Sequence, residues 1–110
     1  MDIPFVLLLM LAAHAIFDFP LQGEQVAINK NRNSCTNLQL EVPWYYWMIA
    51  HALSHGGAVA IITHSFWLGV AETCAHFYID YIKCEKHISI HTDQALHIVC
   101  KFVWIMFLML

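Results

Sequence analysis

Charged residues are scarce in this chain, and basic residues are the scarcest. Asp, Glu, Lys and Arg make up only 12% of the 110 residues, hydrophobic residues make up 60%, and the formal net charge is −3. The five basic residues form no stripe that could neutralise phosphates, which argues against binding to nucleic acid. A composition this apolar is not typical of soluble domains and indicates a membrane protein whose partner is the lipid bilayer.

The chain also lacks paired cysteines and a basic N-terminal region. None of the four cysteines belongs to a CxxC pair, and three lie in or beside apolar runs. This pattern favours small buried hydrophobes over disulfides or a thiolate zinc site. The first apolar run is preceded by Asp2 and not by basic residues, so we expect a retained anchor and not a cleaved signal peptide.

The apolar residues form four segments that we interpret as transmembrane helices. A spanning helix needs about 20 residues, and every backbone polar group in lipid must be bonded internally. We therefore predict an all-α fold in a single domain, residues 1–110: a polytopic membrane four-helix bundle. Its helices are expected at 3–20, 43–64, 66–83 and 91–110, and residues 21–42 are expected to be a polar, solvated loop.

A repeat divides these helices into two tandem hairpins. "AHAIFDF" at residues 13–19 matches "AHFYIDY" at residues 75–81, and each is followed by a helix with two polar residues four positions apart. Such a tandem pair is expected to be related by a pseudo-twofold axis along the membrane normal. The first and third loops then share one side. Four basic residues lie on that side: Lys30, Arg32, Lys83 and Lys86. The positive-inside rule therefore places it in the cytoplasm and both termini outside.

Each predicted helix carries its polar residues in steps of four, which places them on one helix face. With alternating helix directions, the four stripes fall in the same half of the membrane, near its cytoplasmic face. Ionisable residues at that depth cost about 3 kcal/mol each, so we expect a compensating site. Imidazole and carboxylate ligands suit zinc, and also manganese or iron. We therefore predict two divalent ions, with zinc favoured, held by His14, Asp18, His51, His55, His76, Asp80, Asp93 and His97.

Glu72 and Lys101 have no counterparts in the first hairpin and lie deeper than the predicted ligands. One interpretation is an ion pair that neutralises two buried charges. The other is catalytic: Glu72 would be a ligand or a proton-transfer base, and Lys101 would hold an anionic substrate group. Gln22 and Gln94 are expected to support the ligands by hydrogen bonds.

The complete pattern resembles a known family. His-x3-Asp-Phe-x2-Gln at residues 14–22, His-x3-His at 51–55, His-x3-Asp-Tyr at 76–81 and Asp-Gln-x2-His at 93–97 are similar to an uncharacterised family of small membrane proteins from bacteria and phages. More loosely, they resemble membrane-bound metal-dependent hydrolases. The resemblance implies a location in the bacterial inner membrane and favours hydrolysis.

Three functions remain open at this level. The first is a metal-dependent hydrolase that acts on a lipid-linked ester or phosphoester at the membrane. The second is a metal or proton translocator, as a single chain or as an oligomer, because chains of Asp, Glu and His also line such pathways. The third is a phage-type accessory membrane protein without catalysis.

Overall fold

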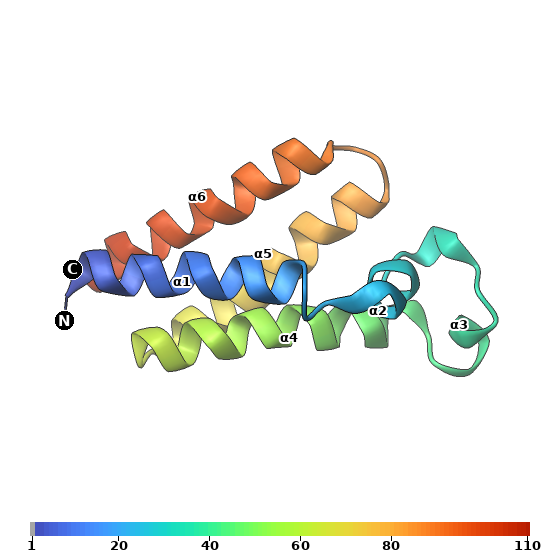
Figure 1. The fold of residues 1–110 in the computed structure, drawn as a ribbon, viewed down its shortest axis with the longest axis horizontal. Helices are drawn as coiled ribbons and strands as arrows, with labels where there is room; N and C mark the ends of the chain where they lie inside the picture. Colours follow the sequence, from blue (N-terminus) through green and yellow to red (C-terminus); the bar gives the residue numbers. More distant parts are fainter. Residues whose placement is uncertain (1) are drawn as a thin grey trace.

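The computed structural model describes residues 2–110 and is built from helices alone (Figure 1), which confirms the predicted all-α class. Four long helices form a bundle: α1 (Ile3–Asp18), α4 (Trp44–Thr63), α5 (Phe66–Cys84) and α6 (Ile90–Leu108). Three short elements lie beyond one end of it: α2 (Gly23–Asn29), the 3-10 helix η1 (Arg32–Ser34) and α3 (Leu38–Glu41).

The ends of the long helices follow from local chemistry. Free backbone N–H groups at a helix start favour a side-chain acceptor. Asp2, Ser65 and Ser89 provide such acceptors at the starts of α1, α5 and α6. Helix α4 ends at His64, which has a left-handed φ of 55° and turns the chain directly into α5.

Helices α4 and α5 pack most closely, because Gly56 and Gly69 have no side chains at the contact between them. A Cβ on Gly56 would lie 1.8 Å from Thr73 Oγ1 and 2.6 Å from the carbonyl oxygen of Gly69. A Cβ on Gly57 would meet no described atom within 4 Å. The two adjacent glycines therefore differ: Gly56 permits the helix contact, and Gly57 faces open space.

Apolar and polar side chains occupy opposite ends of the bundle interior. The end at which α1 begins and α6 finishes, near both termini in Figure 1, contains an apolar cluster. The buried members of this terminal cluster are Val6, Met10, Val59, Leu68, Trp104 and Ile105. The buried histidines and carboxylates lie at the opposite end.

Residues 21–42 differ from the solvated loop predicted for them. This segment contains α2, η1 and α3, and it buries Asn29 and Lys30, which are 1% and 3% exposed. Asn33 donates a hydrogen bond of 2.6 Å to Glu85 Oε2 at the end of α5, and this bond, together with Arg32, holds the pKa of Glu85 below its ordinary value. The segment is thus a structured cap on the polar end of the bundle. The prediction failed because it considered polarity and not the contacts available to the polar groups.

Among residues 2–110, no individual helix combines the length and hydropathy expected of a membrane span. Only α1 and α2 taken together satisfy those criteria, and the pair is bent by 81° at the break between them.

The two adjacent glycines provide a matched test of the packing. Gly56→Ala should lower the free energy of unfolding by about 1–3 kcal/mol, because overpacking forces α4 and α5 apart. Gly57→Ala should leave stability unchanged or raise it slightly, since alanine favours the helix. Thermal unfolding followed by circular dichroism measures both changes. Equal stability of the two variants would contradict the close contact.

Candidate metal centre

The carboxylate of Asp18, in the last turn of α1, lies at the centre of the buried polar cluster. Its Oδ1 atom is 3.0 Å from His51 Nε2, 3.2 Å from His55 Nε2 and 3.4 Å from His76 Nε2. These histidines come from the facing helices α4 and α5, so three elements converge on one oxygen. Asp18 and the three rings are all at most 6% exposed.

The spacing of these four atoms suits a tetrahedral metal site. Zinc–ligand bonds of about 2.0–2.1 Å place tetrahedral ligands about 3.3 Å apart. The three oxygen–nitrogen separations at Asp18 have this size, and His51 Nε2 lies 3.2 Å from His76 Nε2. All four residues offer ligand atoms within 4.8 Å of one another, so this Asp18 group could hold a metal ion.

The second oxygen of Asp18 belongs to a neighbouring set of groups. Gln94 donates to Oδ2 at 2.7 Å and accepts from His14 Nε2 at 2.9 Å through its own carbonyl oxygen. Two further groups have spacings that could hold an ion: His14 with His76 and His97, and Asp18 with Asp93 and His97. Seven of the eight predicted ligands therefore fall in at least one such group. The support expected from Gln94 is present, and Gln22 Nε2 donates to the Asp18 backbone carbonyl at 3.1 Å.

Asp80, the eighth predicted ligand, has a different environment from its repeat partner Asp18. Its Oδ2 accepts from Lys30 Nζ at 2.7 Å, and its Oδ1 lies 3.0 Å from His97 Nε2. His51 Nε2 is also within 3.2 Å of Oδ2. An ammonium group therefore already neutralises Asp80, and Asp80 connects the cap to histidines that are candidate metal ligands.

Glu72 and Lys101 form the ion pair that the sequence offered as one alternative. Lys101 Nζ donates to Glu72 Oε1 at 2.7 Å, and Trp104 donates to Oε2 at 2.7 Å. The same Oε1 lies 3.3 Å from His76 Nδ1. With Nδ1–H directed at this carboxylate, the lone pair of His76 Nε2 faces the Asp18 group, which is the usual way in which a carboxylate orients a metal-binding imidazole.

The buried charges and unpaired nitrogens favour a bound cation. Within residues 2–110, four carboxylates and two ammonium groups are almost fully buried, which leaves two excess negative charges when the histidines are neutral. Four buried atoms in the cluster also have no hydrogen-bond partner among the described residues: His14 Nδ1, His55 Nε2, His97 Nδ1 and Asp93 Oδ1. An unsatisfied buried polar atom costs about 1–3 kcal/mol, and a divalent cation would compensate both deficits.

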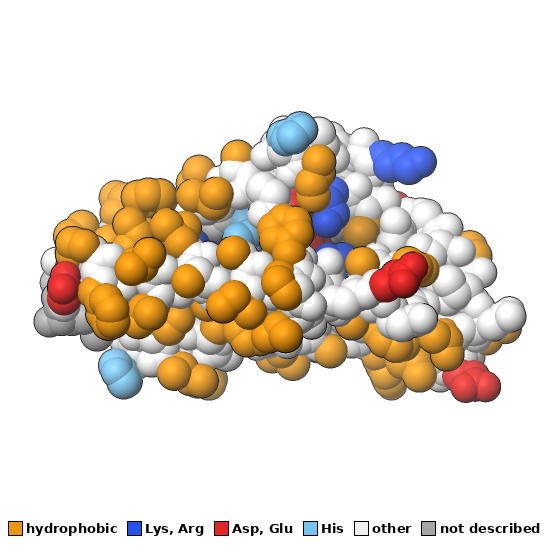
Figure 2. All heavy atoms as spheres, viewed as in Figure 1, with side chains coloured by type: hydrophobic (Ala, Val, Ile, Leu, Met, Phe, Trp, Pro, Cys, Tyr) orange, Lys and Arg blue, Asp and Glu red, His pale blue; other side chains and the backbone are white. Residues whose placement is uncertain are grey.

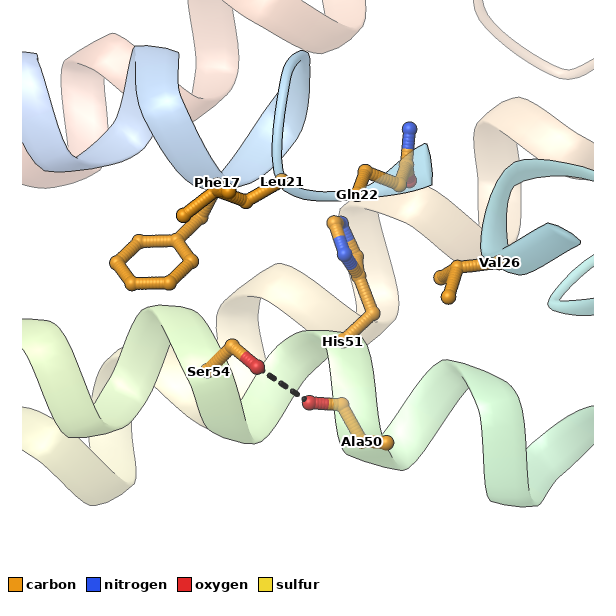
Figure 3. Close-up of a pocket in the computed structure, with 7 residues that line it drawn as sticks. All are labelled: Phe17, Leu21, Gln22, Val26, Ala50, His51 and Ser54. Carbon is orange, nitrogen blue, oxygen red and sulfur yellow. Dashed lines mark hydrogen bonds between the residues drawn. The ribbon is translucent and has the colours of Figure 1, made fainter. Parts of the chain in front are cut away.

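A small pocket gives access to this cluster between α1, α2 and α4. It has a volume of about 100 Å³, and the ring of His51 forms part of its wall (Figure 3). Gln22 lies beside His51, and the remaining lining residues are Phe17, Leu21, Val26, Ala50 and Ser54. The pocket therefore presents one candidate ligand to the outside through a largely apolar opening.

Sequence reasoning missed two participants. Lys30 was assigned to a solvated loop, although it binds Asp80, and Trp104 was not singled out, although it binds Glu72. The available signal for Lys30 was its position directly after "GEQVAIN". A short helix formed by that sequence could bring Lys30 to the bundle. Nothing in the spacing distinguished Trp104 from an ordinary apolar residue.

The fold and the site together define a compact helical protein with a buried His/Asp cluster that could bind metal. The chain belongs to the DUF3307 family, described as proteins of unknown function, whose model matches residues 6–110. The expected resemblance to an uncharacterised family is thereby confirmed over nearly the whole chain. No curated protein and no solved structure matches the chain significantly.

The Lys30–Asp80 pair can be tested by removing one charge. Lys30→Met should lower the free energy of unfolding by about 3–5 kcal/mol, because it leaves Asp80 buried without its counter-charge. Lys86→Met is the matched control, since Lys86 is exposed, and it should have little effect. Chemical denaturation of both variants measures the difference. A wild-type unfolding curve for Lys30→Met would show that the cap does not neutralise Asp80.

Proposed function

We propose that this protein is an integral membrane, metal-dependent hydrolase whose zinc-type site is formed by Asp18, His51, His55 and His76. The observation that carries the proposal is the approach of three imidazole nitrogens to Asp18 Oδ1 at 3.0–3.4 Å. Hydrogen bonding accounts for only part of this arrangement: His51 Nε2 is hydrogen-bonded to that oxygen, whereas His55 Nε2 lies 3.2 Å from it and has no hydrogen-bond partner among the described residues. A shared cation accounts for the whole arrangement.

Membrane insertion is supported by the distribution of side chains. Among residues 2–110, thirteen buried residues are polar or charged and only ten are hydrophobic, whereas large hydrophobic side chains such as Leu8, Ile61, Trp67 and Met106 are more than 60% exposed. Hydrophobic side chains cover much of the face formed by α1 and α6 (Figure 2). Large exposed apolar surfaces mark contact with lipid or with other proteins. We therefore place the long helices in lipid despite their modest individual hydropathy.

The orientation follows from the basic residues around the cap. Arg32 pairs with Glu85, and Lys30 pairs with Asp80, so the basic residues gather at the end of α5 together with Lys83. By the positive-inside rule this end faces the cytoplasm of a bacterial cell, and both termini face outward. The metal centre then lies just below the inner surface of the membrane.

In this proposal, the metal ligands and the Glu72–Lys101 pair have different roles in hydrolysis. A zinc-type ion held by these four residues would have to take a water as an additional, fifth ligand; it would lower the pKa of that water and stabilise negative charge on the substrate. Glu72 orients His76 and neutralises Lys101. Glu72 and Lys101 are therefore positioning residues in this proposal, and the catalytic roles considered from sequence are not assigned to them. In hydrolysis, the water oxygen bonds to the ester carbon or phosphorus, the bond to the alcohol oxygen breaks, and a proton passes to the released alcohol.

The terminal cluster favours hydrolysis over translocation. A pathway across the membrane would need polar groups at both ends, but Val6, Met10, Leu68 and Trp104 fill the interior beyond Glu72 with apolar side chains. The polar groups are therefore accessible from one end only. A contact-only accessory role would not require eight ionisable groups at matched depth.

The metal content of the purified protein is the first test. Wild-type protein should retain about one or more equivalents of zinc after dialysis, measured by elemental analysis, because a buried site with four protein ligands binds zinc tightly. Asp18→Ala and His55→Ala should lose this metal. His64→Ala is the matched control, because His64 is exposed at the opposite end of α4. Equal metal in all four proteins, or none in the wild type, would refute the site.

Hydrolysis is tested with the protein reconstituted into phosphatidylglycerol and phosphatidylethanolamine vesicles. Wild-type protein should remain in the vesicles after an alkaline carbonate wash and release fatty acid or a phosphate-containing headgroup, detected by chromatography. A chelator or Asp18→Asn should abolish release, and His64→Ala should preserve it. Metal-loaded protein that cleaves neither lipid would contradict the hydrolase assignment. Zinc flux from loaded vesicles would then favour translocation.

A further inference from the structure

A second apolar depression continues from the pocket beside His51. This groove, of about 470 Å³, lies along the seam between α1 and α4. Phe17 and Ser54 line both the groove and the small pocket, so the two spaces adjoin. The groove is lined by Ala13, Phe17, Leu53, Ser54, Gly57, Ala58, Ile61 and Ile62.

The side chains that line the groove suit a hydrocarbon chain. Ser54 is its one polar side chain, and the Ser54 hydroxyl already donates to the Ala50 carbonyl at 2.9 Å. The described side chains that line the groove therefore leave no hydrogen-bonding group unpaired for an occupant. Gly57 and Ala58 in the middle of its α4 wall are small and leave room for an apolar chain, and Leu53, Ile61 and Ile62 line the rest of that wall.

The pocket and the groove together have about the length of one leaflet. From Ala50 in the pocket to Ile62 in the groove, the α4 wall extends over twelve residue steps, or about 18 Å at the rise of an α-helix. One leaflet contributes about 15 Å to the hydrocarbon core. The groove runs along the helices, as an acyl chain does, and its polar end reaches the candidate metal centre.

We propose that the α1–α4 groove binds one acyl chain of a membrane phospholipid and so brings the linkage near its headgroup to the pocket at His51. This inference rests on the proposed function and names its substrate class: glycerophospholipids of the cytoplasmic leaflet. The small pocket admits only the group to be cleaved, and the groove holds the tail.

Photo-crosslinking tests chain binding independently of catalysis. The full-length protein is reconstituted into vesicles that contain phosphatidylglycerol with a diazirine on one acyl chain, irradiated, and mapped by mass spectrometry. Adducts should concentrate at Ala13, Ala58 and Ile61 and should be displaced by excess unlabelled phosphatidylglycerol. Adducts spread evenly over the exposed apolar faces of α5 and α6 would indicate only surrounding bilayer lipid and would overturn the proposal.

Filling the groove separates this inference from the metal centre. Ala58→Trp should remove the Ala13 and Ile61 adducts and slow phosphatidylglycerol cleavage by about 10²-fold, while zinc content remains unchanged. Val70→Trp is the matched control, because exposed Val70 lines a different depression, between α4 and α5. Wild-type adducts and rates in Ala58→Trp would refute the groove. Absence of zinc from the purified wild-type protein would instead refute the proposed function.

Discussion

The burial of one carboxylate, that of Asp18, constrains most of this structure. Removing a charge from water costs several kcal/mol, and it must be repaid by nearby charges and hydrogen bonds. Asp18 obtains compensation from imidazoles on α4 and α5 and from Gln94 on α6, so all four long helices must keep their spacing around it. The close contact at Gly56 serves the same requirement, because it brings α4 and α5 near enough for His51 and His76 to converge.

The bundle separates two environments along its length. Apolar side chains fill the end near the termini, and ionisable groups fill the other end beneath the cap formed by residues 21–42. The Glu72–Lys101 pair lies at the boundary, where Trp104 bonds to Glu72 and also packs in the terminal cluster. This arrangement yields a polar site that is closed on one side, which, in the membrane location that we propose, suits a reaction or binding event at one surface better than passage across it.

The two copies of the internal repeat have similar sequences, but their equivalent residues have different surroundings. Asp18 and Asp80 occupy equivalent repeat positions and both contact imidazoles, yet Asp80 is also paired with the ammonium of Lys30. Similarly, Glu72 corresponds to Met10, which lies in the terminal cluster. The two hairpins therefore differ: within residues 2–110, the carboxylate of Asp18 has no ammonium partner, and that of Asp80 is neutralised by Lys30. The cap, which occurs once, provides the asymmetry through Lys30.

The sequence by itself determined the helical class, the polar stripes and their convergence, because a four-residue spacing places side chains on one helix face whatever the partner. It could not determine which nitrogen meets which oxygen, since the groups containing Asp18 depend on how the helices rotate and cross. Tertiary structure alone decided that Lys30 neutralises Asp80 and that Trp104 holds Glu72. Those contacts join residues 50 and 32 positions apart, and only the folded chain brings such partners together.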